Sequence, residues 1–537
     1  MAMMRKYDAI VVGAGHNGLV TAGYLARGGL KVLVVERRPV LGGACVTEEP
    51  FAGYRISTAS YVCSLLDPGV IADLELGRFG YEIFPKDPSS FTPLPDGRFL
   101  LFWQDEQKTF DQIAKFSRRD AERFPRYESL INRLAIFAEG QFRKTPVNLP
   151  PLTPEDWQRL FALGGDLLRL GWKDSRALAK VMRSSVKSFL DDYFESDVLK
   201  ATLATDGVIG FNGGPSTPGS AYVLLHHCMG EVGGKRGLWG FVRGGMGGIA
   251  QALARSAEAR GVDFRVSAPV AKIHFRSGAA AGIVMENGDE VEAPVVVSNA
   301  DPRRTFLQLI DKEHLAASFR SRVEGIRMEG SAMKINLVLG ELPDFKSRPG
   351  TTLGPQHKGT IHICPSLRYM EEAWRDAAAG RPSNHPMLEC CIPTAYDDSL
   401  APAGRHILSI FVQYAPYRLA EGSWDDLKDA YADRVIDALA DYAPNVGSAI
   451  IERQVLTPLD LEREFGLTHG NIFHGDMVLN QLYSFRPVRG WAQYRTPIRG
   501  LYLCGSGTHP GGGVTGLPGY NAAREILKDV GAGKVKA

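Results

Sequence analysis

Three glycines near the N-terminus have the spacing that lets a backbone approach a phosphate group. Gly13, Gly15 and Gly18 form the pattern G-x-G-x-x-G, and Glu36 follows 18 residues after the last of them. A pyrophosphate must come close to N–H groups at a helix N-terminus, and a Cβ on the turn would stand in its way. A carboxylate in the position of Glu36 can accept hydrogen bonds from ribose hydroxyls. The pattern predicts a dinucleotide site.

The residues around this motif predict a strand–helix–strand unit. Residues 9–12 are a short apolar, β-branched run that ends at glycine, residues 19–27 have helical spacing, and residues 32–35 are a second apolar run. Gly42 and Gly43 come shortly afterwards, where a chain that folds back over the pyrophosphate again needs bare backbone. This trailing glycine pair favours FAD over NAD.

Composition indicates a folded protein with two sizeable cores. The chain has 537 residues, 44% of them hydrophobic and 23% charged, and a net charge of +2. This charge balance argues against nucleic acid as a partner. Few residues precede the first predicted strand, and no stretch reaches the roughly 18 apolar residues of a membrane span. We expect a cytoplasmic protein.

The seven cysteines do not form a redox pair in the sequence. Flavin disulfide reductases carry a second cysteine five residues after the first, but Cys45 is followed at that distance by Pro50. Cys390 and Cys391 are adjacent in an apolar run and are expected to be strand residues. A thiol–disulfide reaction beside the cofactor therefore has no support.

Longer amphipathic helices replace the glycine-rich pattern in the next part of the chain. Helical spacing occurs in residues 108–116, 119–137, 154–170 and 178–194, which indicates a helical insertion in a second domain. The apolar stretch 157–172, between charged flanks, could enter a membrane surface to collect a lipid-soluble substrate. The alternative, which we favour from the sequence, is a helix that faces the core.

The second glycine cluster, residues 243–248, does not predict a separate NAD site. No β-branched strand runs directly into it, and no acid ends the strand expected over residues 263–270. This region is expected to complete the first domain, with the backbone near Val270 against an adenine.

The C-terminal part has a further strand, glycine loop and helix, over residues 501–504, 505–516 and 517–527. Such a helix can direct its N-terminal N–H groups at the pyrimidine edge of a flavin. Upstream, residues 466–487 contain His469 and His474. Their spacing is not that of a zinc site, so we expect no metal here and a packed turn that could line a substrate cavity.

These motifs resemble those of the phytoene desaturase-related FAD oxidoreductases, over nearly the whole chain. The resemblance is carried by the segments GAGHNGLVTAGYLARGG, VVERRPVLGGA, GGMGGIAQALA, VSNADP and LYLCGSGTHPGGGVTG. It implies an α/β fold with a Rossmann-like FAD-binding domain built from discontinuous segments, residues 1–70, 236–330 and 486–537. An α+β substrate domain, a mixed sheet with inserted helices, would take residues 71–235 and 331–485.

The resemblance also implies which residues contact noncovalent FAD. The expected cofactor-binding residues are Gly13, Gly15, His16, Asn17, Gly18, Glu36, Arg37, Gly42, Gly43, Ala44, Val270, Gly505, Val514 and Thr515. Related amine oxidases place an acid just after the glycine that corresponds to Gly505. This chain has Ser506 there, which argues for the desaturase side of the family.

Catalytic side chains are the least predictable part of the site. Desaturases of this type extract hydride with the flavin itself and use few acid or base groups. His474, Thr508 and His509 are the candidates, although a structural or flavin-contact role is favoured for each of them.

The sequence thus predicts an FAD-dependent oxidoreductase of the desaturase or dehydrogenase type, which transfers a hydride from a hydrophobic isoprenoid or polyene to the flavin. Oxygen, a quinone or NAD(P) would accept the electrons. Peripheral contact with a membrane is an accompanying expectation. Two alternatives remain open: an amine oxidase-like enzyme with a polar substrate, and a non-catalytic protein that keeps FAD and binds partners. The sequence does not predict the oligomeric state.

Overall fold

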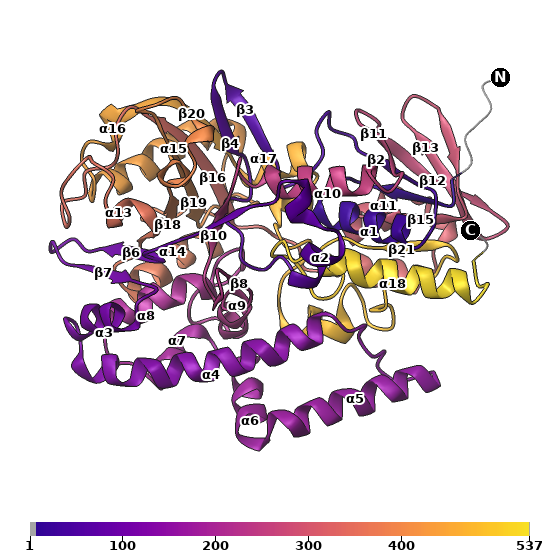
Figure 1. Cartoon of the computed structure of the whole chain (residues 1–537), viewed down its shortest axis with the longest axis horizontal. Coiled ribbons are helices and arrows are strands. Elements are labelled where there is room, and N and C mark those ends of the chain that lie inside the picture. The colour runs from indigo at the N-terminus through magenta and orange to yellow at the C-terminus, as the bar shows by residue number, and fades with distance from the viewer. Residues whose placement is uncertain (1–6, 536–537) are drawn as a thin grey trace.

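Two sheets organise residues 7–535, the part of the chain that the computed structural model describes (Figure 1). The first is a five-stranded parallel sheet. Its strands, in spatial order, are β11 (Asp263–Arg265), β2 (Val32–Val35), β1 (Ala9–Val12), β15 (Val295–Ser298) and β21 (Leu501–Leu503). Strands β1, β2 and β15 are buried at every position, as expected for apolar runs covered on both faces.

Each face of the parallel sheet has its own cover. Helices α1 (His16–Arg27), α10 (Gly247–Glu258) and α18 (Leu517–Gly531) pack together on one face (Figure 1). A three-stranded antiparallel sheet covers the other face. Its strands are β12 (Val270–Arg276), β13 (Ala279–Met285) and β14 (Glu290–Glu292). The segments of this half come from both ends and the middle of the chain.

The second sheet has seven strands and is mixed, with β17 and β6 as its parallel pair. In spatial order its strands are β20 (Ile450–Leu456), β16 (Ala332–Leu339), β19 (His406–Gln413), β18 (Met387–Cys391), β17 (Thr360–Ile363), β6 (Ser90–Pro93) and β7 (Phe99–Phe102). Cys390 and Cys391 are buried strand residues. The apolar side chains of one face pack against α15 (Trp424–Ala440).

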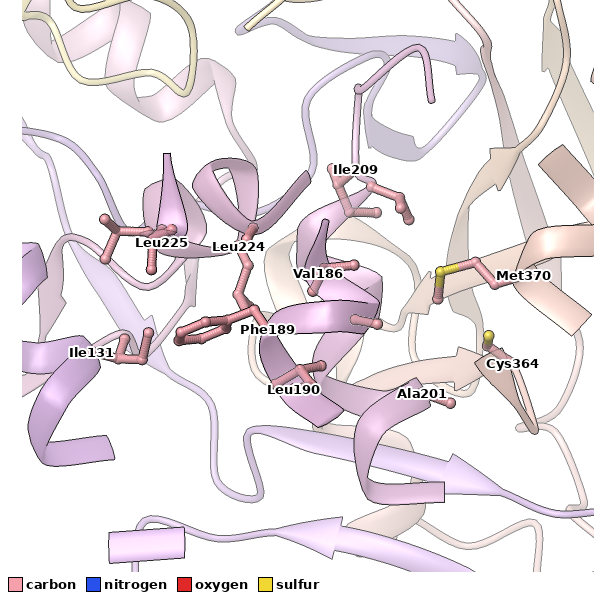
Figure 2. Packing of buried hydrophobic residues seen from close by; sticks show 14 of the residues in the cluster. Ile131, Val186, Phe189, Leu190, Ala201, Ile209, Leu224, Leu225, Cys364 and Met370 are labelled. Carbon is pink, nitrogen blue, oxygen red and sulfur yellow. The ribbon is translucent and has the colours of Figure 1, made fainter. Parts of the chain in front are cut away.

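A layer of helices lies against the seven-stranded sheet. It comprises α3 (Glu106–Ala114), α4 (Arg118–Phe142), α6 (Trp172–Val181), α7 (Val186–Asp191), α8 (Asp197–Ala204) and α9 (Ser220–His227). Figure 2 shows the apolar core that joins them, with Ile131, Phe189 and Leu224 facing one another. The single helix expected over residues 178–194 is wrong, because Ser185 caps a new helix by accepting from the Ser188 N–H.

The remaining elements are short. They are β3 (Thr47–Phe51), β4 (Tyr54–Ser57), α2 (Pro68–Asp73), β5 (Ile83–Pro85), β8 (Glu231–Val232), β9 (Lys235–Arg236), β10 (Gly240–Val242), α11 (Pro302–Leu307), α12 (Ala317–Glu324), α13 (Pro355–Lys358), α14 (Leu367–Ala378), α16 (Val446–Ala449) and α17 (Pro458–Phe465).

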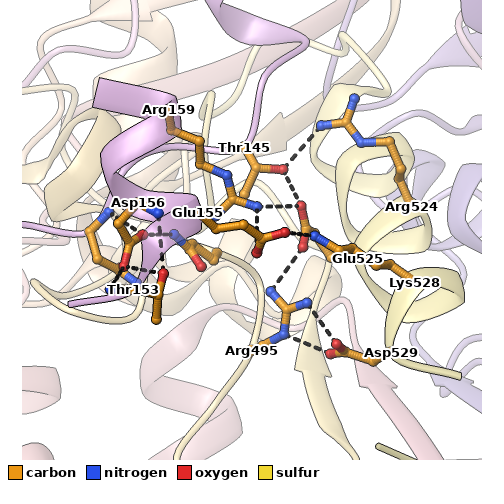
Figure 3. A network of polar contacts seen from close by, with 12 residues as sticks. Thr145, Thr153, Glu155, Asp156, Arg159, Arg495, Arg524, Glu525, Lys528 and Asp529 are labelled. Carbon is orange, nitrogen blue, oxygen red and sulfur yellow. Dashed lines mark hydrogen bonds and ion pairs between the residues drawn. The ribbon is translucent and has the colours of Figure 1, made fainter. Parts of the chain in front are cut away.

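Helix α5 (Pro154–Leu170) does not face the core, so that part of the prediction is wrong. Phe161, Leu168 and Trp172 are 72%, 83% and 81% exposed. The polar side of the helix faces the protein instead, where Arg159 donates to the buried Glu525 of α18 (Figure 3). None of the helices between residues 7 and 535 is long and apolar enough to cross a bilayer.

The predicted α/β class is confirmed. All strands of the parallel sheet fall in the ranges expected for the cofactor domain, and all strands of the seven-stranded sheet fall in those of the substrate domain. Strand β5 pairs with β10 between the two sets of ranges. The exact domain boundaries stay a prediction.

Candidate cofactor and substrate site

The turn between β1 and α1 requires glycine for steric reasons. Gly13 has a φ of +95°. A Cβ on Gly15 would lie 2.7 Å from Asn299 Nδ2, and one on Gly18 would lie 2.2 Å from the Gly13 carbonyl oxygen. Gly15 is also the N-cap residue of α1, without a side chain to cap the helix. The N–H groups at this helix end are therefore open to an anion.

The second glycine pair lies directly beside the first turn. Gly42 forms a parallel bridge with Gly15 and donates its N–H to the Ala14 carbonyl over 2.9 Å. Gly43 has a φ of +59°, and its Cβ would lie 3.0 Å from Gly15 Cα. The structure thus brings together the two glycine segments that the sequence predicted to hold one pyrophosphate.

Glu36 stands at the carboxyl end of β2, next to this turn. It is buried, and its carboxylate accepts from the Ala14 N–H over 2.8 Å and from the Arg38 N–H over 2.9 Å. Arg37 points elsewhere: its guanidinium donates to the carbonyls of Arg463 and Glu464 at the end of α17. Of these two residues, Glu36 lies beside the glycine turn; its contact with a ribose stays a prediction.

Several buried polar atoms at this edge have no protein partner among the described residues. They are His16 Nε2, Asn17 Oδ1, Arg38 Nη1 and Arg304 Nε. An unpaired buried donor or acceptor costs about 1–3 kcal/mol, so a ligand that bonds to these atoms would be stabilised. Together with the bare glycine backbone and the helix N-terminus, they fit a phosphate- and ribose-bearing cofactor.

Segments far apart in the sequence complete the cofactor edge. Val270 begins β12, and the Ala268 N–H just before it donates to the Glu36 carbonyl over 2.9 Å. Asn17 Nδ2 donates to Ser506 Oγ over 3.2 Å, which joins α1 to the C-terminal glycine loop. That loop contains Gly505, Val514 and Thr515 and leads into the N-terminus of α18. The contacts of these residues with a cofactor stay predictions.

Arg486 has a structural role that the sequence did not reveal. Its buried guanidinium donates to the carbonyls of Phe473, Gly475, Asp476, Gln481 and Ser506. Burial lowers the pKa of Arg486 to about 10. This one side chain fastens the loop of residues 473–486 to the C-terminal glycine loop.

None of the three catalytic candidates lines the cavity of about 360 Å³ that lies between the cofactor edge and the seven-stranded sheet. Thr508 Oγ1 donates to the Gly505 carbonyl over 2.8 Å, and His509 Nε2 lies 3.1 Å from the Gln141 carbonyl oxygen. Burial lowers the pKa of His509 to about 4. His474 is buried with Nδ1 unpaired, and burial lowers its pKa as well. Catalysis by these residues stays a prediction.

One cavity of about 360 Å³ connects the cofactor edge with the seven-stranded sheet. His16, Ala44 and Val514 line it on the cofactor side. Apolar side chains, including Phe124, Ile131, Ile209, Leu224, Phe411 and Ile472, line much of the rest. This volume is within the range of small-molecule sites. No cluster of possible metal ligands occurs among residues 7–535.

Comparison with known proteins identifies the family. The model for flavin-containing amine oxidoreductases matches residues 18–305. The chain belongs to this family. It is 45% identical over 547 residues to the rat pyridine nucleotide-disulfide oxidoreductase domain-containing protein 2, which covers 98% of this chain and 94% of the rat protein.

A more distant relative and a solved structure extend the comparison. The lycopene-forming phytoene desaturase of Pantoea ananas is 26% identical, over 95% of this chain and 96% of that protein. The predicted resemblance to desaturase-related oxidoreductases is thereby confirmed. Putrescine oxidase bound to putrescine has the same fold, with a TM-score of 0.59 at 16% identity, over 98% of this chain and 99% of that one.

Proposed function

We propose that the chain is an FAD-dependent dehydrogenase that oxidises a largely apolar small molecule, of the isoprenoid or polyene class. One observation carries this proposal: residues of the predicted cofactor edge and apolar residues of the substrate domain line the same cavity. A substrate in this cavity would lie against His16, Ala44 and Val514. FAD, when bound, supplies the acceptor for a hydride from the substrate.

The protein would contribute binding, orientation and exclusion of water. Gly15 and Gly43 allow the backbone to approach a pyrophosphate, and Glu36 stands where it can accept from a ribose. The N-terminus of α18 would favour negative charge that develops on the cofactor ring. Apolar walls such as Ile209 and Leu224 keep water from the reacting carbon.

Two alternatives compete with this function. The family includes amine oxidases, so a polar amine could be the substrate; Ser506, in place of their acid, argues against it. A protein that keeps FAD and binds partners without turnover is the second alternative. For a dehydrogenase, oxygen, a quinone or NAD(P) would take the electrons.

The test is an absorbance spectrum of the purified protein, followed by anaerobic titration with isoprenoids, polyenes and amines. Bleaching of the flavin band at roughly 450 nm by an isoprenoid or polyene is the expected result. Bleaching by an amine alone would select the first alternative. A bound flavin that no compound reduces would favour the second, and failure to bind flavin after reconstitution would overturn the proposal.

A further inference from the structure

A row of side chains on the seven-stranded sheet faces the cavity and is mostly polar. Lys334 pairs with Phe411 across β16 and β19, Phe411 with Glu389 across β19 and β18, and Glu389 with His362 across β18 and β17. All four line the cavity. Because side chains alternate along a strand, the positions between them, such as Ile335, belong to the apolar core on the other face.

We call this row, together with Lys86 and Asp206, the charged wall. Lys86 and Asp206 bring opposite charges to it but do not form an ion pair with each other. Lys86 is 2% exposed and donates to Thr360 Oγ1. No carboxylate lies within ion-pair distance of its Nζ in the described part of the chain. The Asp206 carboxylate has neither an ion pair nor a hydrogen bond there, although both residues line the cavity. Burial raises the pKa of Asp206 to about 6, and the nearby charge of Lys86 opposes this shift.

The other charged members of the wall already have partners. Glu389 accepts from the Tyr61 hydroxyl over 2.7 Å, and its other oxygen lies 3.9 Å from His362 Nε2. Lys334 donates to Asn336 Oδ1 over 2.7 Å and to Ser409 Oγ. Lys86 Nζ and the Asp206 carboxylate are therefore the donor and the acceptor best placed to receive a ligand.

The balance of charge limits what this wall can bind. Two lysines face two carboxylates, and burial lowers the pKa of His362 to about 3, which leaves its imidazole neutral. An ionic ligand would add a net charge to a buried, nearly neutral site. A pure hydrocarbon would leave the Lys86 ammonium with the Thr360 hydroxyl and the Phe241 ring alone, and the Asp206 carboxylate without a hydrogen bond. A hydroxyl group is both a donor and an acceptor, so it satisfies both.

We propose that Lys86 and Asp206 bind a hydroxyl group of the substrate, which accepts from Lys86 Nζ and donates to the Asp206 carboxylate. The substrate is then an apolar alcohol. This inference rests on the proposed function, because it assumes that the substrate occupies the cavity, and it narrows the substrate class from hydrocarbons to hydroxylated compounds.

The test compares four ligands with one short isoprenoid skeleton: the hydrocarbon, the alcohol, the carboxylic acid and the amine. Isothermal titration calorimetry measures their binding to the flavin-loaded protein, without turnover. We expect the alcohol to bind at least about 100-fold more tightly than the hydrocarbon, because a buried hydrogen-bonding site rejects an analogue that lacks the hydroxyl. Equal affinities would overturn the proposal.

The pH dependence of binding separates the hydroxyl from ionic head groups. The groups around the Asp206 carboxylate are Lys86, Glu389, Tyr61, Tyr127, His227 and Cys228. The affinity of the alcohol should change little from about pH 5 to about pH 8, because a hydroxyl can bond to either form of Asp206. If the acid binds most tightly and increasingly so towards low pH, or the amine most tightly and increasingly so towards high pH, the site has another specificity and the proposal is wrong.

Two variants remove one half of the site each. Lys86→Met and Asp206→Asn should weaken binding of the alcohol about 10- to 100-fold. Neither variant should weaken binding of the hydrocarbon, and Lys86→Met should strengthen it, because no incompletely paired ammonium is then covered. Lys235→Met is the matched control, because Lys235 lines the same cavity but its ammonium already donates to the Gln104 carbonyl. Flavin content and Tm report folding, and the isosteric Asp206→Asn carries the test if Lys86→Met does not fold.

A preference for the alcohol that survives in both variants would overturn the assignment of these residues. The binding data are also independent of the proposed function. Selective binding of the alcohol without flavin reduction would count against the dehydrogenase alone, whereas flavin reduction by a hydrocarbon without preference for the alcohol would count against the hydroxyl site alone.

Discussion

The two sides of the cavity are built from different parts of the polypeptide. The cofactor edge consists largely of backbone: the turn around Gly15, the N-terminus of α1 and the glycine loop before α18. The opposite wall consists of side chains, such as Lys86 and Glu389, from strands and loops far apart in the sequence. A site made of backbone needs glycine at fixed spacing, whereas a site made of side chains needs only a common sheet face.

The two sides also differ in what they cost the folded protein. Bare glycine backbone at a helix end adds little strain when no cofactor is bound, so the cost at this edge lies in its unpaired buried atoms, such as His16 Nε2. Buried ammonium and carboxylate groups lose their hydration, and incomplete pairing, as at Lys86 and Asp206, does not offset this loss. The wall is therefore expected to govern stability against pH, and the cofactor edge to govern flavin binding.

The largest effect of a substitution is expected at the cofactor edge, on the binding of flavin. Gly15→Val would place side-chain atoms against Asn299, whose Nδ2 already lies 2.7 Å from a Cβ position, and would block the approach of a pyrophosphate. We expect flavin content after reconstitution to fall to near zero, measured by absorbance. Gly77→Ala is the control, because a Cβ there meets nothing within 4 Å. Full flavin content in Gly15→Val would show that this turn does not hold the cofactor.

Substitution of Arg486 tests whether the loops of the cofactor edge also depend on a side chain for their stability. Arg486→Met would remove the donor from buried carbonyls, including those of Phe473 and Ser506. We expect the free energy of unfolding to fall by about 3–5 kcal/mol, measured by urea denaturation. Arg486→Lys keeps the charge without the planar fork and should recover only part of the loss. A change below about 1 kcal/mol would mean that the loops hold without this clamp.

Lys334 tests the cost of charge in the opposite wall. Burial lowers its pKa from the ordinary 10.5 to about 7. Between these values the unfolded chain binds more protons than the folded one, so stability from this residue is lost as pH falls towards 7 and gained as pH rises. Relative to Lys334→Met, the unfolding free energy of the natural chain should increase by about 1.4 kcal/mol per pH unit above about pH 7. A difference that stays flat from about pH 7 to about pH 9 would contradict this.

The difference between a cofactor edge made of backbone and a wall made of side chains explains which part of the site the sequence could predict. Gly13, Gly15, Gly42 and Gly43 form local patterns with a direct physical cause, and the structure brings them together. The charged wall has no such pattern, because four of its members become neighbours through the register of β16, β19, β18 and β17, and Lys86 and Asp206 join them from outside this sheet. Lys334 in β16 and Glu389 in β18 were local signals, since a charged residue inside a buried strand requires a reason.

The catalytic role of the predicted histidines stays a prediction for a related reason. His509 and His474 were candidates from the sequence, but side-chain type alone does not tell whether a group faces a cavity. In the structure the imidazole of His509 contacts the Gln141 carbonyl, and neither residue lines the cavity. Only the packing of distant segments distinguishes a buried structural histidine from one that meets a substrate.

Helix α5 also shows that the sequence does not tell which side of a helix faces the protein. Substitutions on its exposed side are expected to change stability least. Its amphipathic pattern predicted an apolar side facing the core. In the structure Arg159 and Glu155 face α18 instead (Figure 3). The apolar side, with Phe161 and Leu168, is exposed. Basic residues, including Lys173, lie beside it, so we propose that this face contacts an anionic membrane surface. Phe161→Ser with Leu168→Ser should reduce sedimentation with anionic vesicles and change the free energy of unfolding by less than about 0.5 kcal/mol per site. Unchanged sedimentation of the variant, or no sedimentation of the natural chain with the vesicles, would refute the membrane contact. The proposed ligands would then be confined to the two sides of the cavity.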